Sequence, residues 1–131
     1  MSAATPTPVP IPIRYPAPLL PGARIAVIAP SSGVPAPLHP RLDRVLGHLR
    51  TQGFEVAEGL SLRHENMSAS APAGQRAAEL MHALQRDDIA AIVPPWGGEL
   101  AIELLDKLDW AALQAATPKW WLGYSDTSTL M

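Results

Sequence analysis

The sequence predicts an α/β domain with an open parallel sheet and helices on both faces. Three observations predict it. Short apolar runs without polar alternation are typical of buried parallel strands, amphipathic segments of helical period lie between them, and the two kinds of segment alternate along the chain. Such alternation implies right-handed strand–helix–strand crossovers. Ligands of this fold class bind at the carboxyl ends of the strands.

Four strands and three long helices are predicted, in the order strand, helix, strand, helix, strand, helix, strand. The strands are the apolar runs 24–29, 54–57, 89–93 and 120–122. The helices are 39–52, 73–86 and 99–108, where apolar side chains recur at helical spacing. A loop is predicted over 60–71, where the periodicity is weak, and a further helix begins after Ser125.

Residues 1–22 form a proline-rich arm in front of the α/β domain, which occupies residues 23–131. Seven of the 15 prolines lie before Gly22. Proline fixes φ and removes a backbone donor, so the arm is expected to be extended and polyproline-like. Two placements are open: a frayed terminal tail, or a strap packed on the domain or on a partner.

Composition excludes several classes of protein. The chain has 131 residues, enough for one domain, and its 47% apolar residues can build a core. A net charge of -2 without a basic run argues against binding to nucleic acid or to a membrane surface. No apolar run approaches the ~20 residues of a membrane helix, and no signal peptide is recognisable. The absence of cysteine excludes disulfides and fits a cytoplasmic location.

The candidate site lies in three loops that follow predicted strands: 30–33, 96–99 and 123–126. In the last loop an apolar strand is followed by Gly-Tyr-Ser-Asp and a helix start, which is the order of a nucleophile elbow presenting Ser125. Thr127 replaces the second glycine of the α/β-hydrolase motif, which argues against that superfamily. The alternative is that Ser125 is only the N-cap of a helix.

Three segments together resemble a known family of serine peptidases, the LD-carboxypeptidases and microcin C immunity (MccF-like) proteins. They are Ile-Ala-Val-Ile-Ala-Pro-Ser-Ser at 25–32, Pro-Pro-Trp-Gly-Gly at 94–98 and Gly-Tyr-Ser-Asp at 123–126. The resemblance extends from about Arg24 to Met131. It implies a flavodoxin-like amino-terminal domain that carries the nucleophile, and a carboxyl-terminal domain that supplies a glutamate and a histidine. That second domain is not in this sequence, so the chain alone is expected to be nearly inactive.

The resemblance assigns Ser125 as the nucleophile. It assigns the backbone N–H of Asp126 and an N–H of the Gly97–Gly98 turn to the oxyanion hole. These roles suit the chemistry, because a tetrahedral oxyanion needs fixed donors and glycine lets the backbone approach a substrate closely. No cofactor is expected, and no histidine pair has metal-ligand spacing.

Trp96, Glu99, Ser31 and Ser32 are the predicted substrate-binding residues. Glu99 could bind a substrate amine, or it could serve only as a first-turn carboxylate of the helix that follows. Trp96 could stack on a substrate ring or pack on its own loop. The Trp-Gly-Gly-Glu segment resembles the MccF-like branch more than the murein branch. The implied substrates are a murein peptide with a terminal L,D bond and an aminoacyl-nucleotide amide.

The activating base cannot be assigned within the sequence. The four histidines are His39, His48, His64 and His82, of which His39 and His64 could approach the strand ends. Two other functions stay open: a noncatalytic flavodoxin-like module that binds a small molecule, and an interaction domain that recruits a partner through the arm. A homodimer is also possible, because apolar faces without cover favour self-association.

Overall fold

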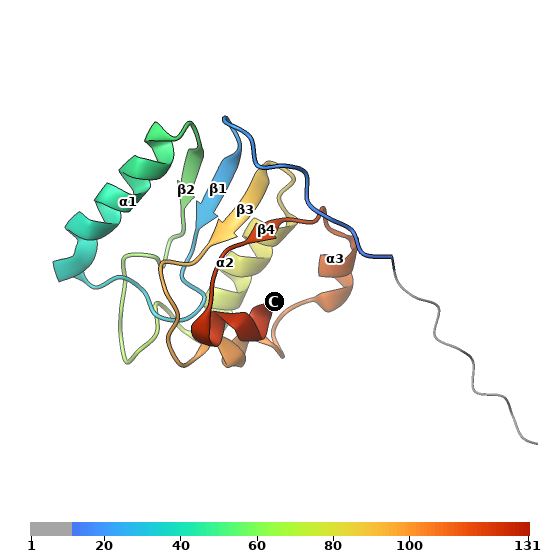
Figure 1. Ribbon diagram of the computed structural model, residues 1–131. Coiled ribbons are helices and arrows are strands. Elements are labelled where there is room, and N and C mark those ends of the chain that lie inside the picture. The colour runs from blue at the N-terminus through green and yellow to red at the C-terminus, as the bar shows by residue number, and fades with distance from the viewer. Residues whose placement is uncertain (1–11) are drawn as a thin grey trace, which may run out of the picture.

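The computed structural model describes residues 12–131, and the first 11 residues of the predicted arm lie outside the described part. Strands β1 (Arg24–Val27), β2 (Glu55–Glu58), β3 (Ile89–Val93) and β4 (Trp120–Trp121) form one sheet in the order β2-β1-β3-β4 (Figure 1). All three strand pairings are parallel. The predicted α/β class and the four predicted strands are confirmed.

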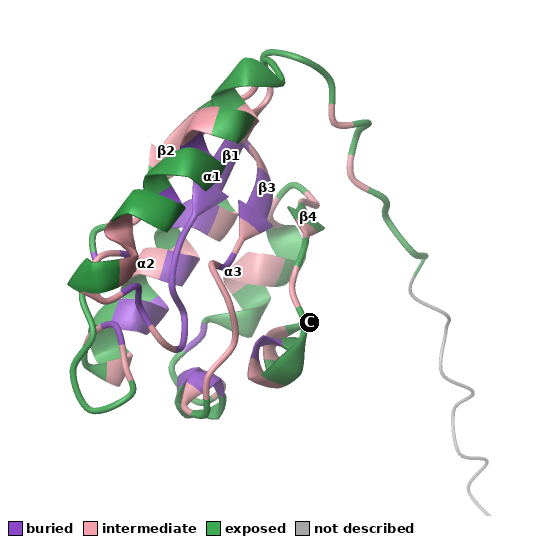
Figure 2. Ribbon diagram, turned by 60° about the vertical axis from the view of Figure 1, so that its left-hand side comes forward, coloured by how far each residue is buried: buried purple, intermediate pink, exposed green. Residues whose placement is uncertain are grey.

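Helices cover both faces of the sheet, as predicted. On one face, α1 (His39–Thr51) packs Leu42 and Leu46 against Ile25 and Val27 of β1. On the other face, α2 (Ala73–Gln85) packs against a second core cluster. The members of this cluster from β1, its carboxyl end, α2 and β3 are Ala26, Ile28, Ala77, Leu80, Ala83, Ile89 and Ile92. The two clusters use alternate residues of the first strand because successive side chains of a strand point to opposite faces. Figure 2 shows β1 and β3 buried between the helices.

The predicted helix over 99–108 is wrong. Only a short 3₁₀ helix, η2 (Ala101–Leu104), forms there, and it is followed by turns. The backbone groups at its start are used by other partners, since Leu100 N–H donates to Ser31 Oγ, Ala101 N–H to Asp126, and Leu100 C=O accepts from Arg76. Tertiary contacts therefore hold this segment in an irregular course despite its helical period.

A short helix, α3 (Trp110–Ala115), was not predicted. Asp109 caps it, because its carboxylate accepts a 3.0 Å hydrogen bond from Ala112 N–H. The aspartate directly before an apolar segment is an N-cap signal that could have identified this helix. Two further 3₁₀ helices, η1 (Ala36–Leu38) and η3 (Ser125–Leu130), complete the regular structure.

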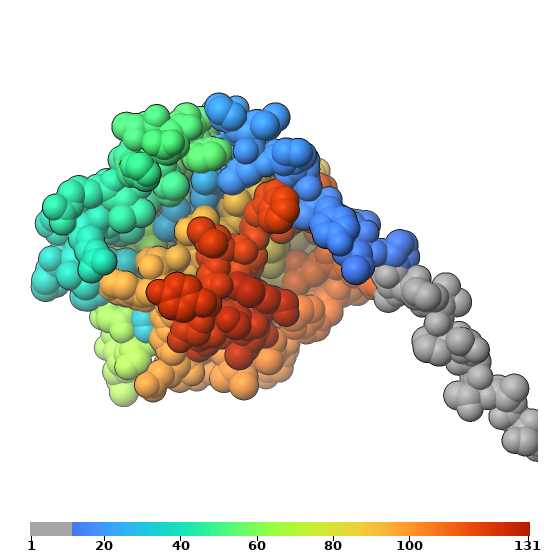
Figure 3. Space-filling model, viewed as in Figure 1, coloured from blue at the N-terminus to red at the C-terminus, as the bar shows by residue number. Residues whose placement is uncertain are grey.

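Residues 12–22, here called the strap, run along the edge of the sheet where the strands begin. The strap contains neither helix nor strand. Its hydrogen bonds to the domain include those from Arg14 to Gln114 O, from Trp120 Nε1 to Ala17 O (2.8 Å) and from Gly22 N–H to Gly53 O (2.6 Å). Leu19 packs against the α1-side core. In Figure 3 it passes in blue across the upper right of the molecule. The strap is therefore held at the edge opposite to the carboxyl ends of the strands.

Candidate active site

The loops that follow β1, β3 and β4 meet at the carboxyl edge of the sheet, as parallel strands require. Their closeness is clearest at two glycines. A Cβ atom on Gly97 would lie 2.8 Å from Ser125 Cβ, and one on Gly98 would lie 2.4 Å from Ser31 Oγ. Both distances are shorter than side chains tolerate, so only glycine permits this approach of the loops. The predicted meeting of the three loops is observed.

Ser125 has a left-handed backbone conformation, with φ of +64°. A residue with a Cβ avoids this region, and holding one there costs about 1–3 kcal/mol. The serine is the first residue of η3, after the turn that follows β4, and it is exposed. Strain at a serine between a strand and a helical turn is the geometry of a nucleophile elbow. Tyr124 holds the N-cap position of η3, and no hydrogen bond of the described residues uses the Ser125 hydroxyl, so the cap alternative is not supported.

The side chain of Asp126 joins the three loops. Its Oδ2 accepts a 2.6 Å hydrogen bond from Ser31 Oγ and a 3.1 Å hydrogen bond from Ala101 N–H. Ser31 Oγ in turn accepts a 3.3 Å hydrogen bond from Leu100 N–H. Sequence reasoning assigned only the backbone of Asp126, and the supporting role of its carboxylate was missed, since no local signal in the sequence pairs residues 31 and 126.

Backbone donors are available beside Ser125. Across residues 12–131, no hydrogen bond of the structure takes the N–H of Gly97, Gly98 or Asp126. Gly97 lies directly against Ser125, since a Cβ there would also be 3.0 Å from Ser125 Oγ. Unused N–H groups on residues that contact or directly follow a serine are candidates for an oxyanion hole.

The predicted substrate-binding residues occupy unequal positions. Ser31 is fully buried and bonded to Asp126, so its position supports the loop rather than a direct substrate contact. Ser32 is half-buried and donates a 3.1 Å hydrogen bond to Ser68 O. Trp96 packs against the α1-side core, which favours the loop-packing alternative. Glu99 is exposed and opens no helix, so its predicted first-turn role is wrong.

None of the four histidines is hydrogen-bonded to Ser125 in the described part of the chain. His39, the first residue of α1, has its Nε2 2.8 Å from Val34 O and 3.2 Å from Arg63 O, and these contacts hold the ring. His48 is exposed on α1. His64 and His82 line a groove elsewhere. The described residues thus present the serine and backbone donors without a hydrogen-bonded base.

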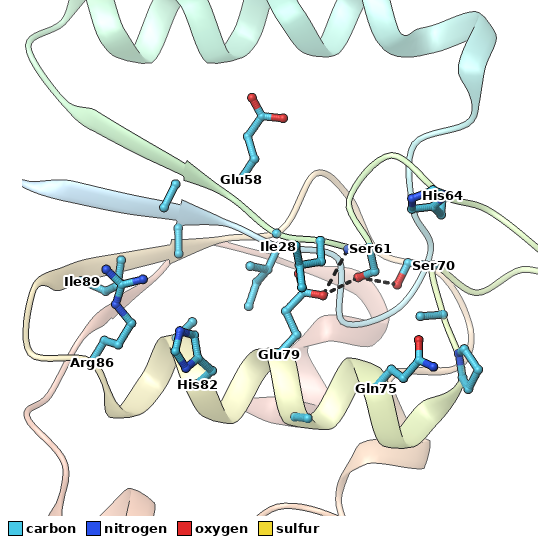
Figure 4. A pocket seen from close by; sticks show the side chains of 18 of the residues that line it. Ile28, Glu58, Ser61, His64, Ser70, Gln75, Glu79, His82, Arg86 and Ile89 are labelled. Atoms are coloured by element: carbon cyan, nitrogen blue, oxygen red, sulfur yellow. Dashed lines mark hydrogen bonds between the residues drawn. The ribbon is translucent and has the colours of Figure 1, made fainter.

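A large cavity lies away from Ser125. It is a groove of about 970 Å³ between α2 and the β1–β2 side of the sheet (Figure 4). Its floor is apolar, with Ala26 and Ile28 of the first strand segment. On its wall, Glu79 Oε2 accepts hydrogen bonds of 2.8 and 3.2 Å from the hydroxyl and the N–H of Ser61, and Ser70 Oγ lies 3.3 Å from that hydroxyl. The three strand-end loops, 30–33, 96–99 and 123–126, do not line it. Ser70, which does line the groove, donates its N–H to Ser31 O at 2.9 Å.

Neither a metal centre nor a membrane span was found in the described chain. Among residues 12–131, no three His, Cys, Asp or Glu side chains are grouped so that they could hold a metal ion. No helix in that range is long and apolar enough to cross a membrane.

The fold and the turn define a doubly wound α/β domain that presents a strained serine at the carboxyl edge of a parallel sheet. The chain belongs to the LD-carboxypeptidase family: the family model described as "LD-carboxypeptidase N-terminal domain" (Peptidase_S66) matches residues 25–131. This result confirms the resemblance found in the sequence, and it makes the domain that of a serine carboxypeptidase family.

Relatives from several bacteria share this domain. A Streptomyces coelicolor protein whose name assigns it provisionally to the carboxypeptidases is 38% identical over 118 residues, covering 88% of this chain and 37% of that protein. The murein tetrapeptide carboxypeptidase of Pseudomonas aeruginosa is 32% identical, covering 82% and 34%. The microcin C7 self-immunity protein MccF of Escherichia coli is 30% identical, covering 88% and 33%. The chain thus spans about a third of the length of these relatives.

Solved structures match the fold closely. The wild-type apo structure of the microcin C7 self-immunity protein MccF superimposes with a TM-score of 0.83 at 30% identity, covering 90% of this chain and 35% of that one. The muramoyltetrapeptide carboxypeptidase from Oxalobacter formigenes gives a TM-score of 0.68 at 31% identity, covering 82% and 34%. Another MccF structure holds aspartyl sulfamoyl adenosine.

Proposed function

We propose that this chain is the nucleophile-bearing part of a serine carboxypeptidase that cleaves an amide bond, with Ser125 as the nucleophile. The observation that carries the proposal is the left-handed backbone of Ser125, held against Gly97 at the carboxyl edge of the sheet. Strain of this kind persists only where the surrounding structure imposes it, and it is concentrated at functional sites.

In the proposed reaction, Ser125 Oγ attacks the carbonyl carbon of the amide while a base accepts the hydroxyl proton. The N–H groups of Asp126 and of Gly98 or Gly97 donate to the oxyanion, and each such donor is worth about 3–4 kcal/mol in comparable sites. The amine leaves with the proton from the base. Water, activated by the same base, then hydrolyses the acyl-serine ester and restores the hydroxyl.

The base is proposed to be the histidine of the family's carboxyl-terminal domain, and the carboxylate that orients it is proposed to be the glutamate of that domain. None of the described histidines forms a hydrogen bond with Ser125, which agrees with a base supplied from outside the described residues. The isolated chain is therefore expected to have little activity, because a serine without its base loses most of its rate advantage.

The substrate is proposed to be either the terminal L,D bond of a murein peptide or the amide of an aminoacyl-nucleotide. Both classes are represented in the names of relatives and structural neighbours. The Trp-Gly-Gly-Glu segment at 96–99 and the higher TM-score with MccF make the aminoacyl-nucleotide the first substrate to test. A cytoplasmic location, a part in murein recycling and a possible homodimer belong to the same proposal.

The test is hydrolysis of an L,D-tetrapeptide and of an aminoacyl-sulfamoyl nucleotide by this chain, alone and mixed with the carboxyl-terminal domain of a relative. Activity that appears only in the mixture, and is lost in Ser125→Ala, would support the proposal and identify the substrate class. Absence of activity in a complex shown to be assembled would contradict it.

A noncatalytic, small-molecule-binding function is the second candidate. The groove of about 970 Å³ favours it, because this cavity is formed away from Ser125. A serine-reactive fluorophosphonate separates the two functions: labelling of Ser125 in the assembled complex supports catalysis, and ligand binding without labelling supports the second candidate.

A further inference from the structure

Arg76 is a buried cation directly behind the three strand-end loops. Its side chain is 1% exposed, although it lies near the start of α2, at the end of the sheet where η2 and η3 are found (Figure 1). Its guanidinium forms a 2.5 Å ion pair with Glu103 of η2. Burying a charge is costly unless it is paired and hydrogen-bonded, so a position of this kind calls for an explanation.

The guanidinium also donates to three backbone carbonyls from three different segments. Nε donates to Ala71 O at 2.7 Å, and one terminal nitrogen donates to Pro30 O at 2.8 Å and to Leu100 O at 2.9 Å. These carbonyls belong to the loop before α2, the loop after β1 and the loop after β3. Arg76 therefore holds together two of the three loops that form the candidate active site.

Two of these carbonyls connect Arg76 to the nucleophile turn. Pro30 is followed by Ser31, whose hydroxyl donates to Asp126 Oδ2, and Leu100 is followed by Ala101, whose N–H donates to the same oxygen. In each pair, Arg76 donates to the carbonyl of the first residue, and Asp126 accepts a hydrogen bond from the second residue. Arg76 and Asp126 therefore bind the same two loop segments.

We propose that Arg76 is a positioning residue for the Ser125 turn, acting through the Pro30–Ser31 and Leu100–Ala101 segments on the carboxylate of Asp126. The proposal rests on the proposed function, because it assigns Arg76 to the placement of that nucleophile. A planar guanidinium with five donors can bind carbonyls of separate segments and a carboxylate at once, whereas lysine has one nitrogen with three donors. The structure thus gives a reason for arginine, specifically, at this position.

The experiment measures amide hydrogen exchange and amide chemical shifts by NMR in this chain, in Arg76→Lys and in Arg76→Met. The matched control is Arg86→Lys, just beyond the end of the same helix, where the arginine is paired at the surface with Asp88. In Arg76→Lys we expect exchange at Ala101 to rise at least tenfold and the amide signals of Gly98 and Asp126 to shift, while the amides of β3 keep their rates. Arg86→Lys should leave all of these signals unchanged.

Two results would overturn the proposal. One is a folded Arg76→Lys in which Ala101, Gly98 and Asp126 behave as in the parent chain. The other is fast exchange of Ala101 in the parent chain itself, which needs no variant and therefore decides the matter if both Arg76 variants fail to fold. Because neither readout uses substrate, a failure of the proposed catalysis is recognised separately, as absent hydrolysis by the assembled complex with an ordered Ser125 turn.

Discussion

Ser31 and Asp126 stand 95 positions apart in the chain and share a 2.6 Å hydrogen bond at the carboxyl edge of the sheet. Ser31 is fully buried, and the same carboxylate oxygen also accepts the N–H of Ala101. The residue that follows the candidate nucleophile therefore binds the loops after β1 and β3. Because Asp126 directly follows Ser125, this pair is the first place to test how the turn is held.

Asp126→Ala should lower the free energy of unfolding by about 2–3 kcal/mol, because it leaves a buried hydroxyl and a buried N–H without their acceptor. Asp126→Asn retains an acceptor oxygen for both donors, and a loss of about 1 kcal/mol is expected. Urea denaturation measures both values. The control is Asp106→Ala, an exposed carboxylate next to Lys107, which should change stability by less than about 0.5 kcal/mol. Equal losses in the two Asp126 variants would contradict the role of the acceptor.

Ser125→Gly should stabilise the chain by about 1 kcal/mol, because glycine adopts φ of +64° without the strain that a Cβ imposes. Ser125→Ala keeps the Cβ and should not have this effect. Both variants should lose all labelling by a fluorophosphonate in the assembled complex. Thermal unfolding compares the pair, and an alanine variant as stable as the glycine variant would show that Ser125 is not strained.

Gly97→Ala should displace the nucleophile turn, since the new Cβ would lie 2.8 Å from Ser125 Cβ and 3.0 Å from Asp126 Oδ1. We expect a loss of at least 1–3 kcal/mol in stability and at least a hundredfold loss of hydrolysis by the assembled complex. The matched control is Gly47→Ala in α1, where a Cβ meets no atom within 4 Å. In Gly47→Ala, the alanine should stabilise the helix by about 0.5–1 kcal/mol. Full activity of the assembled complex with Gly97→Ala would contradict the proposed geometry.

Acid should lower the stability of the folded state through protonation of Asp88. A hydrogen bond from Arg86, aided by the charges of Arg86 and Arg24, lowers the pKa of Asp88 to about 2. A carboxyl group with a lowered pKa stabilises the folded state above its unfolded pKa near 4, and the stabilisation is lost as pH falls from about 4 to 2. Asp88→Asn should remove that part of the pH dependence. Melting temperatures at pH 2, 3, 4 and 7 measure the effect. High salt should reduce it, because the Asp88–Arg86 ion pair is exposed to solvent.

Self-association should occur through the β4 side of the molecule. β4 is one of the two edge strands of the described sheet. Apolar side chains around it are exposed: Trp120 by 44%, Leu122 by 71%, Tyr124 by 80% and Met131 by 63%. An unpaired edge with apolar neighbours favours pairing with a second copy. Analytical ultracentrifugation should show a concentration-dependent dimer that Leu122→Lys weakens. A monomer at all concentrations would contradict this expectation.

Much of the fold could be predicted from the sequence because its signals are local. The periods that mark α1 and α2 and the apolar runs of β1 and β3 are contained in short windows, and the structure agrees with them. The segment 99–108 shows where this reasoning fails. Its helical period is real, but the N–H groups of Leu100 and Ala101 bind Ser31 and Asp126, and such distant partners leave no local trace in the sequence.

The sequence predicted which loops form the candidate site, but not the buried side chains that hold these loops together. The strand-end positions of Ser125 and Gly97 follow from the order of segments, and the family resemblance gave their roles. The buried guanidinium of Arg76 could not be recognised, because an arginine in an amphipathic helix is usually interpreted as a solvent-exposed residue. The groove beside α2 was missed for a similar reason, since its walls come from segments that are separated along the chain.

The hydrogen bond between Ser31 and Asp126 also bears on how the protein is made. A nascent polypeptide that has emerged from the ribosome only as far as η2 already contains Ser31, Arg76 and the Gly97 turn, but not the Asp126 carboxylate that binds Ser31 and Ala101. The buried hydroxyl then lacks its acceptor, and the loops have no common anchor. Because Asp126 follows all four strands in the chain, the contact that binds the loops after β1 and β3 to the Ser125 turn can form only after the whole described sheet has been synthesised.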